Sequence, residues 1–336
     1  MTRRPIMVAA LLALTGVAIW QYRRPAPPPA IDWPSVSHQD LVTAALRLDV
    51  QEGGPGLALR HLTQLAERDT SVVSLTHVYA HGIGRYSLLV RGLPAYADCT
   101  PQFESGCYHG LIEAYVHSLP QLGEINGVCN RISYSEAARR ECAHGLGHGL
   151  WSRLPYQAAL THCDALDSIA AEECRDGVFM QRSGSTEHAS HAAHGAHAAH
   201  AVQSLHCQDE AARYRHACWH YQAWLVVTHG YPAAFATCDA AADYADDCYW
   251  GLGKWIAWTS ANDDEIPARC SQGRRLGACL AGAAEHFIDK DWTTERAERL
   301  CRASPHAGQA ACDETVAGRK AIIAKGRSSS PVTQPQ

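Results

Sequence analysis

The pattern of apolar and polar positions predicts helices along most of the chain. No stretch alternates apolar and polar residues with the period of two that a half-buried strand shows. Proline or glycine breaks instead divide the chain, as in "SLPQLG" (118–123) and "DEIPARC" (264–270). Proline favours the first turn of a helix and glycine favours its end, so each break separates a longer helix from a shorter, Ala-rich one. The pattern predicts an all-α fold of helical hairpins joined by polar loops.

The two ends of the chain differ from this pattern. Residues 1–24 hold an apolar run between two pairs of arginines, which is typical of an export signal. No small-x-small cleavage motif follows, which favours an uncleaved signal anchor, a transmembrane helix, over a cleaved peptide. The proline-rich stretch 25–37 predicts a stiff linker to a repeat domain at 38–324, and residues 325–336 predict a disordered tail.

Fourteen cysteines alternate between short gaps of 8 to 13 residues and long gaps of 20 to 22, with one long gap of 33. Pairing across the long gaps leaves Cys99 and Cys312 without partners, whereas pairing across the short gaps uses every cysteine. An even cysteine set in an exported chain predicts an oxidising compartment, the periplasm or the cell exterior. The predicted pairs are Cys99–Cys107, Cys129–Cys142, Cys163–Cys174, Cys207–Cys218, Cys238–Cys248, Cys270–Cys279 and Cys301–Cys312.

The second cysteine of each pair opens a related phrase, such as "CYHGLIEAYV" (107–116), "CAHGLGHGLW" (142–151) and "CYWGLGKWIAW" (248–258). An earlier copy, "VYAHGIGRYSLL" (78–89), has Tyr79 in the cysteine position. The period is about 31 residues once the excess of the long gap is removed, which is typical of stacked helical units. The predicted fold is an α-solenoid of disulfide-linked hairpins.

The stretch "ADCTPQFESGCYHGLIEAY" (97–115) combines an eight-residue cysteine step with a small residue and then an aromatic residue. In this layout the chain resembles the cysteine-rich Sel1-like repeat proteins, which are relatives of the tetratricopeptide repeats. The resemblance spans roughly residues 55–315 and concerns layout, since the His-Gly phrase is not part of the Sel1 pattern. It implies helical-hairpin repeats with a concave face for a protein or peptide partner.

Aligning the phrases on their cysteines reveals a polar column two residues further on. In a stacked array such positions lie along one face, on helices about 10 Å apart. Three further side chains share helix faces with the column through i,i+4 spacing: His77 with His81, Glu113 with His109, and His148 with His144. The column consists of His81, His109, His144, Asp176, His220, Trp250 and Ala281.

A His-x3-His pair on a helix is a half-site for a transition metal such as zinc, copper or iron. Glu113 and Asp176 are candidates for further ligands, or for the general base that acts on a metal-bound water. The alternative is that the histidines are packing residues bonded to backbone carbonyls, in an envelope scaffold for protein partners. Loss of the column in the last two copies favours a localised site. The predicted ligands are His77, His81, His109, His144 and His148.

A second histidine group, "HASHAAHGAHAAH" (188–200), lies in an insertion at 184–202. Such a tract either binds metal loosely as a collector or is a solvated insertion. The net charge of −5 and the lack of a basic run argue against a nucleic-acid partner. No phosphate loop, GxSxG or HExxH motif is present, so the sequence leaves open whether the protein is an enzyme.

Overall fold

The computed structural model describes residues 37–125, 127–133, 135–184, 204–291 and 293–328. All regular structure in these residues is helical, which confirms the predicted all-α class. The chain forms two compact units, 1–42 and 43–336. The described part of the first unit is the start of α2 (His38–Arg68), where the Asp40 carboxylate accepts hydrogen bonds from Ser37.

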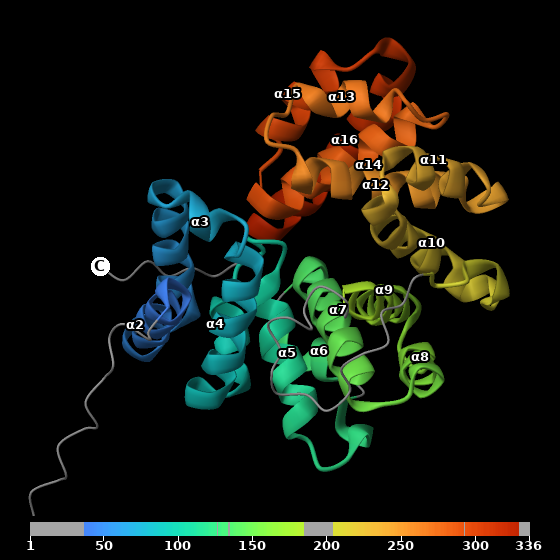
Figure 1. The fold of residues 1–336 in the computed structure, drawn as a ribbon. Helices are drawn as coiled ribbons and strands as arrows, with labels where there is room; N and C mark the ends of the chain where they lie inside the picture. The colour runs from blue at the N-terminus through green and yellow to red at the C-terminus, as the bar shows by residue number, and fades with distance from the viewer. Residues whose placement is uncertain (1–36, 126, 134, 185–203, 292, 329–336) are drawn as a thin grey trace, which may run out of the picture. The chain divides into compact units, whose positions relative to one another are not determined.

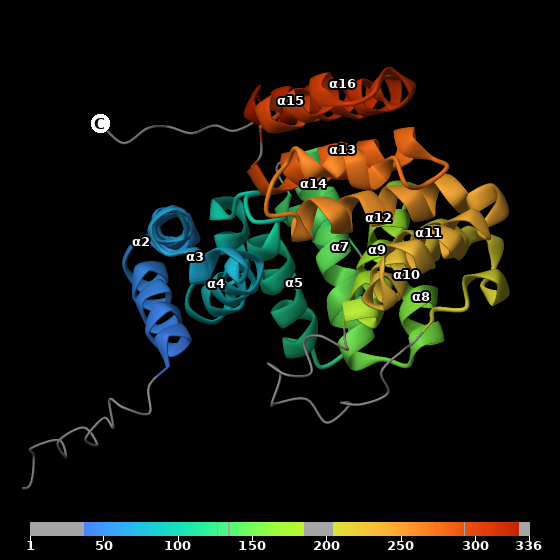
Figure 2. The ribbon, with the colours of Figure 1, turned by 45° about the horizontal axis from the view of Figure 1, so that its top comes forward.

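The larger unit contains a series of longer helices, each packed on the next in chain order. Figure 1 shows α4, α5, α7 and α9 side by side, and Figure 2 shows α12, α14 and α16 in the same relation. Helical repeats are therefore present as predicted. The longer helices are α4 (Thr76–Arg91), α5 (Gly106–Ser118), α7 (Glu136–Arg153), α9 (Ser168–Gly184), α10 (Ala212–Val226), α12 (Ala245–Thr259), α14 (Leu276–Asp291) and α16 (His306–Ser328).

Short helices connect the longer ones and pack against their neighbours. Proline and glycine mark several of the breaks, as predicted. Pro155 precedes α8, and Gly230, with φ 98°, precedes α11. Gly54, with φ 78°, and Pro55 form a further kink inside α2 that was not predicted. The short elements are α3 (Thr70–Val73), η2 (Leu93–Asp98), η3 (Leu122–Ile125), α6 (Val128–Ile132), α8 (Tyr156–Asp164), η5 (Cys207–Asp209), η6 (Val227–His229), α11 (Tyr231–Asp239), η7 (Ala242–Tyr244), α13 (Glu265–Cys270) and α15 (Glu295–Ala303).

All seven predicted disulfides form, and no cysteine in the chain is free. Most of them join the end of a short helix to the next longer helix, as Cys163 of α8 is joined to Cys174 of α9. Each bridge closes a short loop, which reduces the entropy of the unfolded chain and stabilises the fold by about 2–3 kcal/mol. The seven pairs indicate an oxidising, extracytoplasmic environment.

Glycines bring successive longer helices into direct backbone contact. A Cβ atom at Gly110 of α5 would overlap the carbonyl oxygen of His81 on α4. Gly177 of α9 meets His144 of α7 in the same way. These glycines follow the polar column by one residue, so the spacing that forms the repeat also holds the column side chains of adjacent helices close together.

No helix in the described ranges is both long and apolar enough to cross a membrane. The predicted anchor (1–24) lies outside those ranges, as do nearly all of the linker (25–37) and of the His-rich insertion (184–202). Helix α16 extends to Ser328, four residues into the predicted tail.

Candidate metal centre

The five histidines predicted as ligands lie together on three adjacent helices. Helix α4 supplies His77 and His81, α5 supplies His109, and α7 supplies His144 and His148. The ring centroids of His109 and His144 are 4.6 Å apart, and those of His81 and His109 are 5.7 Å apart. Stacking of equivalent repeat positions thus brings the column together, as the sequence alignment predicts.

The cluster divides into two groups of three whose candidate ligand atoms lie within 4.8 Å of one another. We call His77, His81 and His109 the outer group, and His109, His144 and His148 the inner group. His109 belongs to both. The side chains of the inner group are all buried, whereas those of His77 and His81 are partly exposed.

Three of the rings use one nitrogen for a hydrogen bond to a fixed partner. His77 Nδ1 lies 2.8 Å from the carbonyl oxygen of Phe103, and His148 Nδ1 lies 2.7 Å from Gln181 Oε1. His109 Nε2 lies 3.0 Å from Glu141 Oε2. Since a carbonyl or amide oxygen only accepts, His77 and His148 are N–H donors at Nδ1, which leaves Nε2 as the nitrogen that a metal could bind.

The opposite nitrogens of two rings have no partner within the described part of the protein. His109 Nδ1 and His148 Nε2 are buried and make no hydrogen bond. Leaving a buried polar atom unsatisfied costs about 1–3 kcal/mol. Metal-binding histidines show the same arrangement, in which one ring nitrogen makes a hydrogen bond to the protein and the other is free to bind the metal.

Glu113 of α5 supports the cluster from one side. Its Oε2 atom lies 3.5 Å from His81 Nδ1 and accepts a 2.7 Å hydrogen bond from Arg85. Burial alone would raise the pKa of Glu113, but the bond to His81 and the charge of Arg85 outweigh burial and hold that pKa well below its usual range. Glu113 is therefore an ionised group beside His81, and its negative charge would offset the positive charge of a bound cation.

Glu141 of α7 holds His109. Burial raises the pKa of this carboxyl to about 7, and the nearby charge of Asp289 adds to the effect. Burial also lowers the pKa of His81, His109 and His144 well below the ordinary value, and lowers that of His148 to about 4. These four rings are neutral at pH 7, as a metal ligand must be.

A thioether borders the inner group. His144 Nε2 lies 3.3 Å from Met180 Sδ on α9. Sulfur ligands favour soft ions such as Cu(I), while imidazole suits zinc, copper and iron alike. The chemistry around His144 is thus softer than that around His81, whose neighbour is a carboxylate.

A left-handed turn positions His77. Phe103, Glu104 and Ser105 have φ values of 57°, 55° and 59°, a conformation that non-glycine residues adopt at a cost of roughly 1–2 kcal/mol each. The turn aims the Phe103 carbonyl at His77. From its other side, the Phe103 amide donates to the carbonyl oxygen of Lys290, at 3.3 Å, so the turn is held between α4 and α14.

Asp176, the other predicted carboxylate, contacts a different histidine. Its Oδ2 atom lies 4.0 Å from Nδ1 of His220 on α10, too far for a hydrogen bond. The second oxygen of Asp176 and both ring nitrogens of His220 are buried without hydrogen-bond partners. Tyr221 replaces the column glycine on α10 and stacks on His220, with ring centroids 4.3 Å apart. The polar column thus continues beyond the five histidines.

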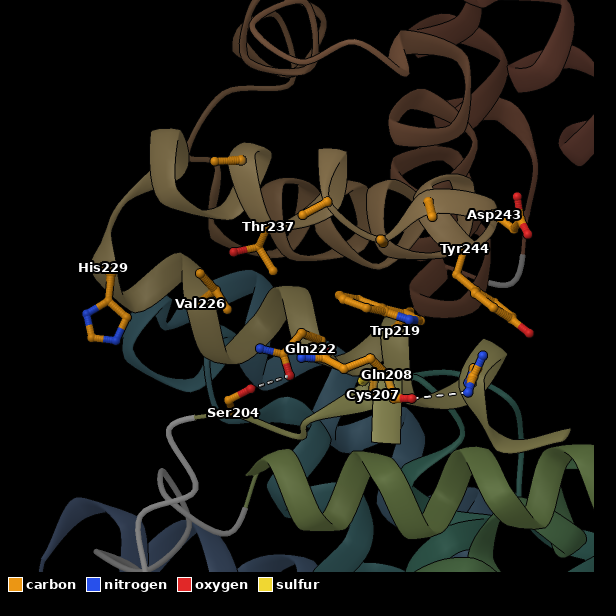
Figure 3. Close-up of a pocket in the computed structure, with 15 residues that line it drawn as sticks. Ser204, Cys207, Gln208, Trp219, Gln222, Val226, His229, Thr237, Asp243 and Tyr244 are labelled. Atoms are coloured by element: carbon orange, nitrogen blue, oxygen red, sulfur yellow. Dashed lines mark hydrogen bonds between the residues drawn. The ribbon is translucent and has the colours of Figure 1, made fainter. Parts of the chain in front are cut away.

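A pocket of about 740 Å³ lies elsewhere in the same unit, with α10 and α11 among its walls (Figure 3). Trp219 and a run of alanines supply much of its lining. The Gln222 side-chain oxygen on its wall already accepts a 2.7 Å hydrogen bond from the Leu205 amide. None of the five clustered histidines lines this pocket, so it is separate from the histidine site.

Sequence reasoning missed the residues that orient the rings: Phe103, Glu141, Met180 and Gln181. One signal was available, because Met180 follows Asp176 by four residues, the spacing at which Glu113 follows His109 and His148 follows His144. The other three partners depend on how neighbouring helices face one another. Comparison with known proteins supplies no further guide: no protein-family model, curated protein or solved structure matches the chain.

Proposed function

We propose that this protein binds a transition-metal ion, zinc, copper or iron, in the buried histidine cluster of α4, α5 and α7. The observation that carries the proposal is the pair of buried, unpartnered nitrogens, His109 Nδ1 and His148 Nε2. Each belongs to a ring whose other nitrogen is held by a protein acceptor. A metal ion between them would satisfy both lone pairs.

The packing alternative fits these contacts less well. Histidines that serve only to bond backbone carbonyls need one carbonyl for each ring, and His77 has one in Phe103. His109 and His148 bond to side chains instead and leave their second nitrogen unsatisfied. Two acidic side chains, Glu113 and Glu141, adjoin the cluster and would balance the charge of a divalent ion.

The proposal includes a location. Seven disulfides are consistent with an oxidising compartment, and the apolar run in residues 1–24 supports a membrane anchor on the chain that carries the domain. The site would then bind metal on the outer side of the membrane. The His-rich tract at 188–200 would collect the same ions loosely.

The test measures metal in the full-length protein after the five tract histidines (His188, His191, His194, His197 and His200) are changed to serine. This variant is loaded with zinc, copper or iron, dialysed and analysed by elemental analysis. We expect it to retain about one ion for each chain, because the five core histidines remain.

The core is tested by adding His109→Ala to the tract variant, with His117→Ala as the matched control. His117 lies on the same helix, α5, but is exposed. We expect the His109→Ala protein to lose its metal and the His117→Ala protein to keep it. A tract variant that retains none of the three metals would refute the proposed function.

A further inference from the structure

The two overlapping histidine groups determine how many ions the cluster holds, provided that it binds metal as proposed above. His109 is a member of both groups. Its Nε2 atom is occupied by Glu141, and its Nδ1 atom is the buried nitrogen without a partner. A nitrogen lone pair coordinates one ion, so the outer and inner groups cannot both be complete at the same time.

We propose that a single ion moves between two overlapping three-histidine positions, with His109 as the ligand common to both. In the outer position His77 and His81 complete the set, and in the inner position His144 and His148 do so. The short distances between the groups favour the transfer, since the ring centroids of His81 and His148 are only 5.7 Å apart. The ion therefore keeps a histidine ligand throughout.

Burial gives the transfer a direction. His77 is half-buried, and His81 is 8 % exposed. Exposure falls to 4 % for His109 and to 3 % for His148, and the side chain of His144 is buried although that residue as a whole is half-buried. The outer group is thus the side at which a solvated ion exchanges its water for imidazole, and the inner group holds it away from solvent. Met180 adds a soft atom at the inner position.

The experiment titrates Zn²⁺ into the full-length tract variant and compares single and double substitutions. His77→Ala removes a ligand from the outer group only, and His144→Ala removes one from the inner group only. Each single variant should bind one Zn²⁺ with affinity reduced by less than about tenfold, because the other position remains complete. The Zn²⁺ affinity of the double variant should fall by more than about 100-fold, which is more than the product of the two single reductions.

The rate of uptake tests the direction. Stopped-flow mixing with Zn²⁺ and a competing chromophoric chelator should show slower uptake in His77→Ala, and an unchanged rate in His144→Ala. Equal slowing of both variants would contradict uptake through the outer group. His117→Ala serves as the control for both measurements.

The outcomes separate this inference from the proposed function. Absence of any bound metal refutes both. Three results would refute the transfer and leave metal binding intact. The first is one bound ion with losses of affinity that simply multiply in the double variant. The others are complete loss of Zn²⁺ binding in either single variant and two bound ions for each chain. Circular dichroism verifies folding of the double variant. If that variant does not fold, His81→Ala with His148→Ala replaces it, since these residues also belong to one group each.

Discussion

The carboxyl group of Asp176 shows how burial changes the behaviour of a single side chain. It occupies the column position that is histidine in the preceding repeats, but its nearest basic partner, His220, is 4.0 Å away. Burial raises the pKa of Asp176 to about 8, and the nearby charge of Glu173 adds to the shift. The folded protein therefore carries this carboxyl in its neutral form at pH 7.

This shift predicts a pH-dependent effect of Asp176→Asn. Between pH 4 and pH 8 the unfolded chain ionises Asp176 while the folded chain does not, so the wild type loses stability as pH rises. The loss is at most about 1.4 kcal/mol per pH unit. We expect Asp176→Asn to be more stable than the wild type at pH 8, by a margin that shrinks towards pH 4. Urea unfolding at several pH values measures the margin, with exposed Asp243→Asn as the control; a pH-independent difference would contradict the prediction.

The approach of one helix to the next depends on residues without side chains. Gly84 of α4 faces the Cys107 carbonyl of α5, and Gly253 of α12 faces the Cys279 carbonyl of α14. This contact places column side chains of adjacent helices within reach of one another. One residue after the column, where Gly110 and Gly177 meet the preceding helix, α10 has Tyr221, and Asp176 and His220 stay 4.0 Å apart without bonding. Glycine at these positions therefore determines which parts of the column come together.

Two glycines of α4 provide a matched test of this close approach. A methyl group at Gly84 would overlap the backbone of α5, whereas one at Gly82 would meet nothing within 4 Å. Gly84→Ala should destabilise the protein by about 1–3 kcal/mol through overpacking. Gly82→Ala should stabilise it by up to about 1 kcal/mol, since alanine favours helix. Thermal unfolding measures both, and equal effects of the two substitutions would contradict the role given to Gly84.

At the scale of the whole unit, clustered histidines on the N-terminal longer helices give way to ion pairs on the C-terminal ones. In the C-terminal repeats, Arg319 of α16 bonds to Glu285 at 2.9 Å and to Asp289 at 2.5 Å, both on α14. Lys254 of α12 lies 3.1 Å from Asp289. The turn at Phe103 joins the two regions by its hydrogen bond to Lys290. Glu141, which holds His109, also feels the charges of Asp289, Arg319 and Lys254, so the histidine cluster and the ion pairs lie close enough to interact.

Removing the central cation of these ion pairs should destabilise the unit. Arg319→Met would leave Glu285 and Asp289 with only Lys254, and breaking such a largely buried pair costs at least about 2 kcal/mol. Arg302→Met is the control, because Arg302 is 65 % exposed and lies 3.8 Å from Glu298. Chemical unfolding should show a clear loss for Arg319→Met and no measurable change for Arg302→Met. Matching results for the two variants would show that the ion pairs add nothing to stability.

The sequence alone was sufficient to predict the disulfides and the helical class. Pairing across the short gaps leaves no cysteine without a partner, so the pairing followed from counting. The gathering of the five histidines was also predictable, because residues at equivalent positions of stacked repeats share one face. Each of these inferences depends on local spacing or on repetition, which a sequence records directly.

Tertiary structure decided what surrounds each ring. Glu141, Gln181 and the Phe103 carbonyl orient their histidines through contacts between residues 26 to 33 positions apart. Such contacts depend on how each helix is rotated against its neighbour, and no local pattern encodes that rotation. The same packing leaves one nitrogen of His109 free between two groups of ligands. Sequence therefore determined which residues meet, and packing decided which of their atoms remain available to bind.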